Sequence, residues 1–178
     1  MKRRLFTFAV ICVLMLFCCN FPTATAKAQA DPVAETDSLR FENMLNHNHL
    51  FGDDFSDINT VVDKSIIPLL DKREDDFIKE DIVKCFVDNM YAFDISNYTP
   101  NTNAPIRDGY IFIMPRGYDS FSHEIISVTK SDTLYCVVSE ITFNTHDGTQ
   151  EKATCETVFL ENESSAFGYN IISANIIE

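Results

Sequence analysis

The residues best suited to chemistry lie in a predicted run of strands near the C-terminus, and Glu140 is the most informative of them. It stands mid-strand, on the same face as Cys136 and Val138. A carboxylate on a mostly apolar inner face has a raised pKa and can act as a general base. The opposite face is more apolar and carries Tyr135, Val137, Ile141, Phe143, Val158 and Leu160. We therefore expect Glu140 to face solvent, and a position in a pocket is the alternative.

Three cysteines follow residue 30: Cys85, Cys136 and Cys155. An odd number cannot pair completely within one chain. If Asp147-Gly148 forms a two-residue turn, Cys136 faces Phe159, and Cys155 faces Glu140. That register holds the two strand cysteines too far apart for a disulfide, so we expect three buried thiols. A bridge from Cys85 to one of them is the alternative, and Cys155 joins Glu140 as a pocket candidate.

The histidines give no strong signal for a metal or a catalytic pair. His47 and His49, two residues apart on a helix, point to different sides and cannot share a metal there. His123 and Glu124 open a strand, where neighbours face opposite sides, so one of them can face inward. No hydrolase, metalloprotease, phosphate-loop or dinucleotide motif is present. We therefore expect no metal, no cofactor and no assigned catalytic residue.

An acidic stretch that begins at Asp53 has the composition of a calcium loop but not its pattern. Counted from Asp53, position 3 is Phe55 and position 6 is Ile58, where an EF-hand needs an oxygen ligand and a glycine. The stretch lies just before a predicted helix. We expect Ser56 or Asp57 to cap that helix.

The first thirty residues predict export. Lys2, Arg3 and Arg4 precede an apolar run over residues 5–21, and Ala28-Gln29-Ala30 fits a signal-peptidase site with Asp31 as the new N-terminus. A retained membrane anchor is the alternative. Cleavage leaves 10 basic and 27 acidic residues, a formal charge of −17. This charge argues against nucleic acid and anionic membranes as partners and is compatible with a basic partner.

Apolar periodicity predicts helices in the first half of the mature chain. Residues 39–51 show an imperfect helical pattern, and residues 58–67 show one apolar face that Pro68 ends or kinks. Residues 77–93 carry the clearest stripe at the helical period. Residues 109–114 are short, apolar and β-branched, which predicts a strand.

The C-terminal third predicts an antiparallel meander of four strands over residues 122–129, 133–143, 153–160 and 167–177. Turn-forming residues separate each pair, and Asp147-Gly148 is the strongest of these signals. Helices followed by strands indicate an α+β class. We expect two or three N-terminal helices packed on a curved, cone-like sheet of four to five antiparallel strands, with residues 77–93 across one face. The segments are a signal peptide (1–30), a polar segment with a short helix (31–54) and one α+β domain (55–178).

This order of elements, with the closing run Gly168-Tyr169-Asn170-Ile171-Ile172, resembles the NTF2-like or cystatin-like α+β cone fold. The resemblance covers residues 55–178 and implies a sheet wrapped around a helix. It also implies a wide range of functions, from small isomerases to inhibitors and non-catalytic modules, so it selects none.

The sequence thus predicts an exported, non-catalytic binding or interaction domain whose partner is an envelope or extracellular protein. The alternative is a small NTF2-like enzyme or ligand carrier with a pocket near Glu140 and Cys155.

Overall fold

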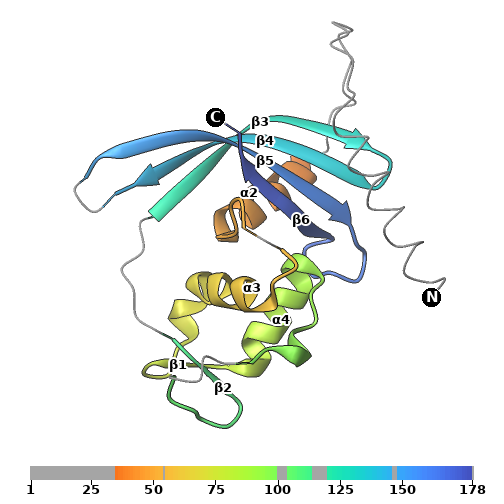
Figure 1. The fold of residues 1–178 in the computed structure, drawn as a ribbon. Coiled ribbons are helices and arrows are strands. Elements are labelled where there is room, and N and C mark those ends of the chain that lie inside the picture. Colours follow the sequence, from red (N-terminus) through yellow and green to blue (C-terminus); the bar gives the residue numbers. More distant parts are fainter. Residues whose placement is uncertain (1–34, 54, 100–103, 114–119, 146–147, 178) are drawn as a thin grey trace, which may run out of the picture.

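The computed structural model describes residues 35–53, 55–99, 104–113, 120–145 and 148–177 (Figure 1). Within them the chain is an α+β protein, as predicted. The helices are α2 (Glu35–His47), α3 (Ile58–Ser65) and α4 (Glu80–Tyr91), with 3-10 helices η1 (Ile67–Lys72) and η2 (Ile95–Asn97). The strands are β1 (Phe77–Lys79), β2 (Tyr110–Phe112), β3 (Ser120–Ser131), β4 (Leu134–Asn144), β5 (Gln150–Glu161) and β6 (Tyr169–Ile176).

Strands β3, β4, β5 and β6 form the predicted antiparallel meander and pair in sequence order. Buried and less buried residues alternate along β4, because every second side chain points to the same face. The predicted export signal (residues 1–30) lies outside the described residues. No helix in the described part of the chain is long and apolar enough to cross a membrane.

The register of the β4–β5 hairpin differs by one position from the prediction. Asn144 pairs with Gln150, so Cys136 lies opposite Val158, and Cys155 lies opposite Ser139. The loop is longer than a two-residue turn: Thr145 N donates to Thr149 O at 3.0 Å, and Gly148 adopts a positive φ of 83°. A one-residue change of register moves a strand's pairing partners to the other face of the sheet.

The strand predicted over residues 109–114 is present as β2, but the helix predicted over residues 77–93 needs a second correction. Phe77 and Ile78 form strand β1 and pair with β2 in a separate two-stranded sheet. Ile78 is fully buried there, opposite Ile111. The helical stripe therefore starts at Glu80, and the main sheet has four strands.

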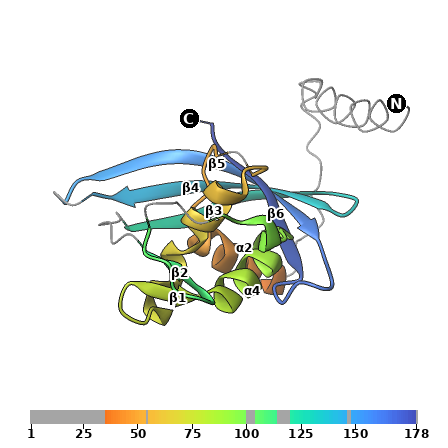
Figure 2. The same cartoon turned by 60° about the horizontal axis from the view of Figure 1, so that its bottom comes forward.

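The helices lie on one side of the main sheet (Figures 1 and 2). Helix α2 contacts β3, and helix α4 contacts β6. Phe41 of α2 is fully buried, and its ring centroid lies 5.2, 4.7 and 4.8 Å from those of Tyr135, Phe159 and Tyr169. Helix α2, predicted as part of a polar segment, thus supplies the centre of the core.

The stretch from α2 into the following loop also reaches both edges of the main sheet. Oδ1 of Asn46 accepts the backbone N–H of His123 on edge strand β3 at 3.2 Å. The backbone N–H of Gly52 donates to the carbonyl of Ala174 on edge strand β6 at 2.8 Å. This short segment therefore spans the inner face of the sheet from one edge strand to the other.

Candidate functional site

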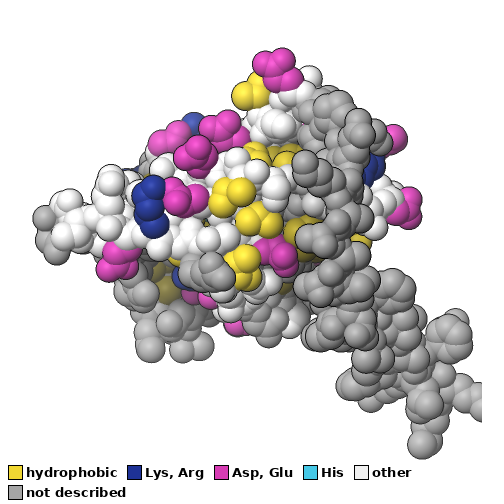
Figure 3. Space-filling view, turned by 90° about the horizontal axis from the view of Figure 1, so that it is seen from above, with side chains coloured by type: hydrophobic (Ala, Val, Ile, Leu, Met, Phe, Trp, Pro, Cys, Tyr) yellow, Lys and Arg dark blue, Asp and Glu magenta, His cyan; other side chains and the backbone are white. Residues whose placement is uncertain are grey.

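Glu140 lies on the outer face of the sheet, away from the helices. It pairs with Glu124 on one side and Thr154 on the other, its carboxylate forms an ion pair with Lys152, and its side chain is 37% exposed. Acidic side chains surround a few apolar ones on this outer face (Figure 3). Glu140 therefore faces solvent, as predicted from the more apolar character of the opposite face of its strand.

Cys155 lies on the inner face and is fully buried, so the structure does not bring it together with Glu140. Burial raises the pKa of the Cys155 thiol, and its Sγ contacts Oγ1 of Thr157 at 3.6 Å. Because the thiolate is the nucleophilic form, a raised pKa makes this sulfur unreactive at neutral pH. No disulfide joins Cys85, Cys136 and Cys155. The prediction of three buried thiols is wrong in part, because Cys85 is exposed on α4 and Cys136 is only half-buried.

The inner face brings together a different set of residues at the end of the sheet where β3 begins. Phe121 and His123 come from β3, Phe143 comes from β4, and His49 and Phe51 come from the loop after α2. We call these five residues the aromatic–histidine cluster. Its four other rings are half-buried, while His123 is only 7% exposed. The cluster is therefore open to solvent at its rim and closed around His123.

His123 is held firmly, yet one of its ring nitrogens has no partner. Its Nδ1 forms a hydrogen bond with the hydroxyl of Ser139 at 2.9 Å. Its Nε2 is buried and has no hydrogen-bond partner within the described part of the chain. In one tautomer Nε2 is an unused donor and in the other an unused acceptor. Either way, a buried polar atom without a partner costs about 1–3 kcal/mol, and native proteins rarely leave one.

The rings around His123 meet edge to face or tilted. The centroid of Phe121 lies 5.6 Å from that of His123 at 88°, and Phe51 lies 5.8 Å away at 33°. Phe51 also meets Phe121 and Phe143 edge to face. Centroid separations of about 4.5–7 Å are favourable for aromatic pairs. Apolar ring edges and faces thus enclose a single polar group.

Both histidines of the cluster are neutral at pH 7. Burial lowers the pKa of His123 to about 4. Burial, followed by the charges of Lys64 and His47, lowers the pKa of His49 to about 4, and its ring lies 4.7 Å from that of Phe121. The cluster therefore has polar groups but no charge at pH 7. A neutral imidazole with so low a pKa is a weak general base.

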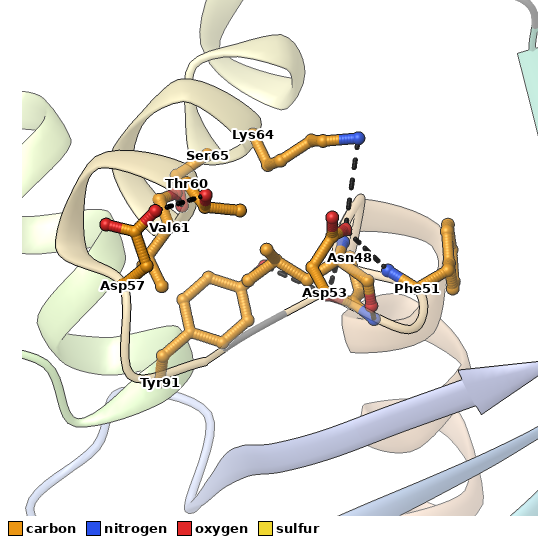
Figure 4. A network of polar contacts seen from close by, with 10 residues as sticks. Asn48, Phe51, Asp53, Asp57, Thr60, Val61, Lys64, Ser65 and Tyr91 are labelled. Atoms are coloured by element: carbon orange, nitrogen blue, oxygen red, sulfur yellow. Dashed lines mark hydrogen bonds and ion pairs between the residues drawn. The ribbon is translucent and has the colours of Figure 1, made fainter.

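A buried polar network holds the loop that carries His49 and Phe51 (Figure 4). The Asn48 amide donates to Leu50 O at 3.1 Å and accepts from Leu50 N at 3.2 Å. Its Oδ1 also accepts the hydroxyl of Tyr91 from α4 at 3.0 Å. Asp53 accepts the backbone N–H of Phe51 at 3.1 Å and lies 3.8 Å from Lys64 Nζ. These contacts fix the loop that carries His49 and Phe51.

The acidic stretch serves this scaffold and the next helix. Asp57 caps α3 by accepting the N–H of Asn59, which confirms the predicted cap. His47 ends α2, where its Nδ1 bonds the carbonyl of Asn43 at 2.7 Å. Among the described residues, no three histidines, cysteines or acids are placed to hold a metal ion.

Comparison with protein-family models, with curated proteins and with solved structures finds no match to this chain. The site therefore rests on its own geometry. The sequence carried one usable signal for it: Phe121, His123 and Ile125 alternate with polar residues, which places His123 on the apolar face of its strand. His49 and Phe51 join the cluster only because of the path of the loop after α2, and no local sequence pattern predicts that path.

Proposed function

We propose that this protein is an exported, non-catalytic binding domain. Its recognition site is the aromatic–histidine cluster, and its ligand has a flat apolar body with one neutral polar atom. The unpartnered Nε2 of His123, in a side chain only 7% exposed, carries this proposal. A ligand atom that reaches this nitrogen recovers a hydrogen bond that the protein cannot make by itself.

The surroundings of that nitrogen define the class of ligand. The rings of Phe51, Phe121 and Phe143 offer apolar edges and faces, which suit a planar apolar or aromatic body. His49 and His123 are neutral at pH 7 because burial lowers the pKa of each to about 4. A charged ligand would be desolvated there without an opposite charge to compensate it.

Several features favour binding over catalysis. The low pKa of His123 makes it a weak base, and Cys155 and Glu140 lie on opposite faces of the sheet. The alternative, a small NTF2-like enzyme or carrier with a pocket near Glu140 and Cys155, loses support because these two residues do not share a face. Export rests on the basic and apolar N-terminal pattern and Ala28-Gln29-Ala30.

The NTF2-like resemblance and a cone-shaped sheet belong to the same proposal. The order of elements supports them: helices, a short strand pair around α4, and then four long antiparallel strands. We place the open end of such a cone at the end of the sheet where β3 begins and the cluster lies.

A matched ligand pair tests the site. p-Cresol and toluene share a body, but only p-cresol has a hydroxyl that can bond Nε2 of His123 once the rings around this buried atom open. We expect p-cresol to bind about tenfold more tightly, the effect of one hydrogen bond to a buried group. The ring signals of His123 in NMR spectra should shift with p-cresol, and His123→Phe should abolish the preference.

His47→Gln is the matched control because that histidine is exposed at the end of α2. It should leave both affinities unchanged. Equal affinity for the two compounds, no binding of either, or a preference that survives His123→Phe would each contradict the proposed site.

A further inference from the structure

A second surface lies along α4 and shares no residue with the aromatic–histidine cluster. It is a groove of about 470 Å³ between α4 and the turn that joins β5 to β6. We call it the α4 groove. It is lined by Asp81, Ile82, Cys85, Phe86, Asn89, Ala166 and Phe167. The turn lies beside α4 in both ribbon views (Figures 1 and 2).

The groove has two walls that hydrogen bonds hold together. Ile82, Cys85, Phe86 and Asn89 are spaced i, i+3, i+4 and i+7, so they form one stripe along α4. Oδ1 of Asn89 accepts the backbone N–H of Ala166 at 2.6 Å, and Ser165 Oγ donates to Asn89 O at 2.7 Å. The groove is therefore preformed, which lowers the entropic cost of binding.

The floor of the groove is apolar. Ile82, Phe86 and Phe167 are half-buried, with one side packed on the main core. Their other sides line the groove, and Cys85 is exposed beside them. An apolar hollow on a chain with a net charge of −13 is typical of an interaction site.

Acidic side chains flank this apolar floor. Asp81 lines the groove, Asp88 follows two turns later on α4, and Glu163 belongs to the turn that carries Phe167. All three are exposed, and none forms an ion pair with another described residue. Lys84, the nearest base on α4, interacts instead with Asp94. The rim therefore carries three carboxylates that form no ion pair with a described residue, and the Arg40 guanidinium lies beside the turn at Gly168.

We infer that the α4 groove docks a basic amphipathic helix of a partner protein. Apolar side chains at i and i+4 of the partner would fill the hollow over Ile82 and Phe86. Lysines or arginines beside them would meet Asp81, Asp88 and Glu163. Helix-in-groove binding uses such anchors, and the complementary charge selects the partner and speeds association. This inference does not depend on the ligand proposed for the cluster.

Two synthetic helical peptides test it with the purified protein. Both carry leucines at i, i+4 and i+7, and one has lysines where the other has glutamates. The lysine peptide should bind and slow alkylation of Cys85, measured by peptide mapping, because Cys85 lines the groove. The glutamate peptide should do neither, and added salt should weaken the binding of the lysine peptide.

Variants at exposed positions localise the binding without threatening the fold. Ala166→Lys places a bulky cation at the rim and should weaken the lysine peptide about tenfold. Asn175→Lys makes the same change of charge on exposed sheet surface and should have no effect. Asp81→Asn with Asp88→Asn should weaken binding about threefold, whereas Asp108→Asn with Glu151→Gln should not.

Four results would overturn the inference. Equal binding of both peptides would remove the charge selection, and unchanged alkylation of Cys85 would place the peptide elsewhere. Full affinity of Ala166→Lys would exclude the groove. Binding of the protein to neutral lipid vesicles, with no binding of the lysine peptide, would also reject a protein partner in favour of a membrane.

Discussion

The hydroxyl of Tyr91 donates to Oδ1 of Asn48 at 3.0 Å, across 43 residues of sequence. This bond joins the last turn of α4 to the loop that places His49 and Phe51 in the aromatic–histidine cluster (Figure 4). Both partners are almost fully buried. The geometry of the cluster therefore depends on a helix that contributes no residue to it.

Removing this bond should loosen the loop without unfolding the protein. We expect Tyr91→Phe to lower the free energy of unfolding by about 1 kcal/mol, because Asn48 Oδ1 keeps its bond from Leu50 N. Urea denaturation measures the change. Tyr98→Phe is the matched control, since Tyr98 is only half-buried. An equal loss in both variants would mean that the Tyr91 bond contributes nothing specific.

Stability should fall as the pH drops below 6.5. The pKa of His123 is about 4 in the folded protein and 6.5 when unperturbed, so between these values the unfolded chain binds a proton that the native state does not. For His123 the loss should reach roughly 2 kcal/mol near pH 4.5. Urea midpoints at several pH values should therefore decline less steeply for His123→Phe. Parallel declines would show that His123 is not desolvated.

Helix α2 should be essential to the core. Phe41 is fully buried among Tyr135, Phe159 and Tyr169, so Phe41→Ala should cost about 3–5 kcal/mol. Leu39→Ala, on the same helix but 62% exposed, should change stability by less than about 0.5 kcal/mol. Comparable effects in chemical denaturation would contradict the packing of α2 under the sheet.

An engineered disulfide can read the register of the β4–β5 hairpin. Cys155 lies directly opposite Ser139, so Ser139→Cys should form an intramolecular disulfide on oxidation at alkaline pH, where the Cys155 thiolate is populated. Glu140→Cys, one position along, should not, because its side chain points to the outer face. Mass spectrometry of the oxidised proteins distinguishes the two variants. A bridge in Glu140→Cys alone would restore the register of a two-residue turn.

The sequence predicts the class and the main sheet well because strand alternation and turn residues are local signals. The four strands of the meander, the cap at Asp57 and the outward position of Glu140 follow from such patterns. The hairpin register does not, because Asp-Gly also occurs in longer loops in which the glycine adopts a positive φ. One extra residue there places Cys155 opposite Ser139 and on the other face from Glu140.

Tertiary contacts decide the remaining differences. Phe77 and Ile78 continue the helical stripe of α4 in sequence, but pairing with β2 holds them in a strand. The site itself combines two neighbouring strands with a loop that lies about 70 residues earlier in the sequence. Only Phe121 and Phe143, which face each other across β3 and β4, follow from strand pairing alone.

The segment that bridges the two edge strands has a consequence for the protein's behaviour at high concentration. Exposed strand edges are templates on which other chains add strands and polymerise. Here Asn46 occupies a backbone donor on β3, and Gly52 occupies a backbone acceptor on β6. Irregular pairing interrupts β3 at Ile125 and Ser127 and the β5–β6 ladder at Val158 and Phe159. The open sheet has two edge strands, and a closed barrel has none. The segment from Asn46 to Gly52 covers part of both edges, so we expect it to hinder the addition of strands from other chains.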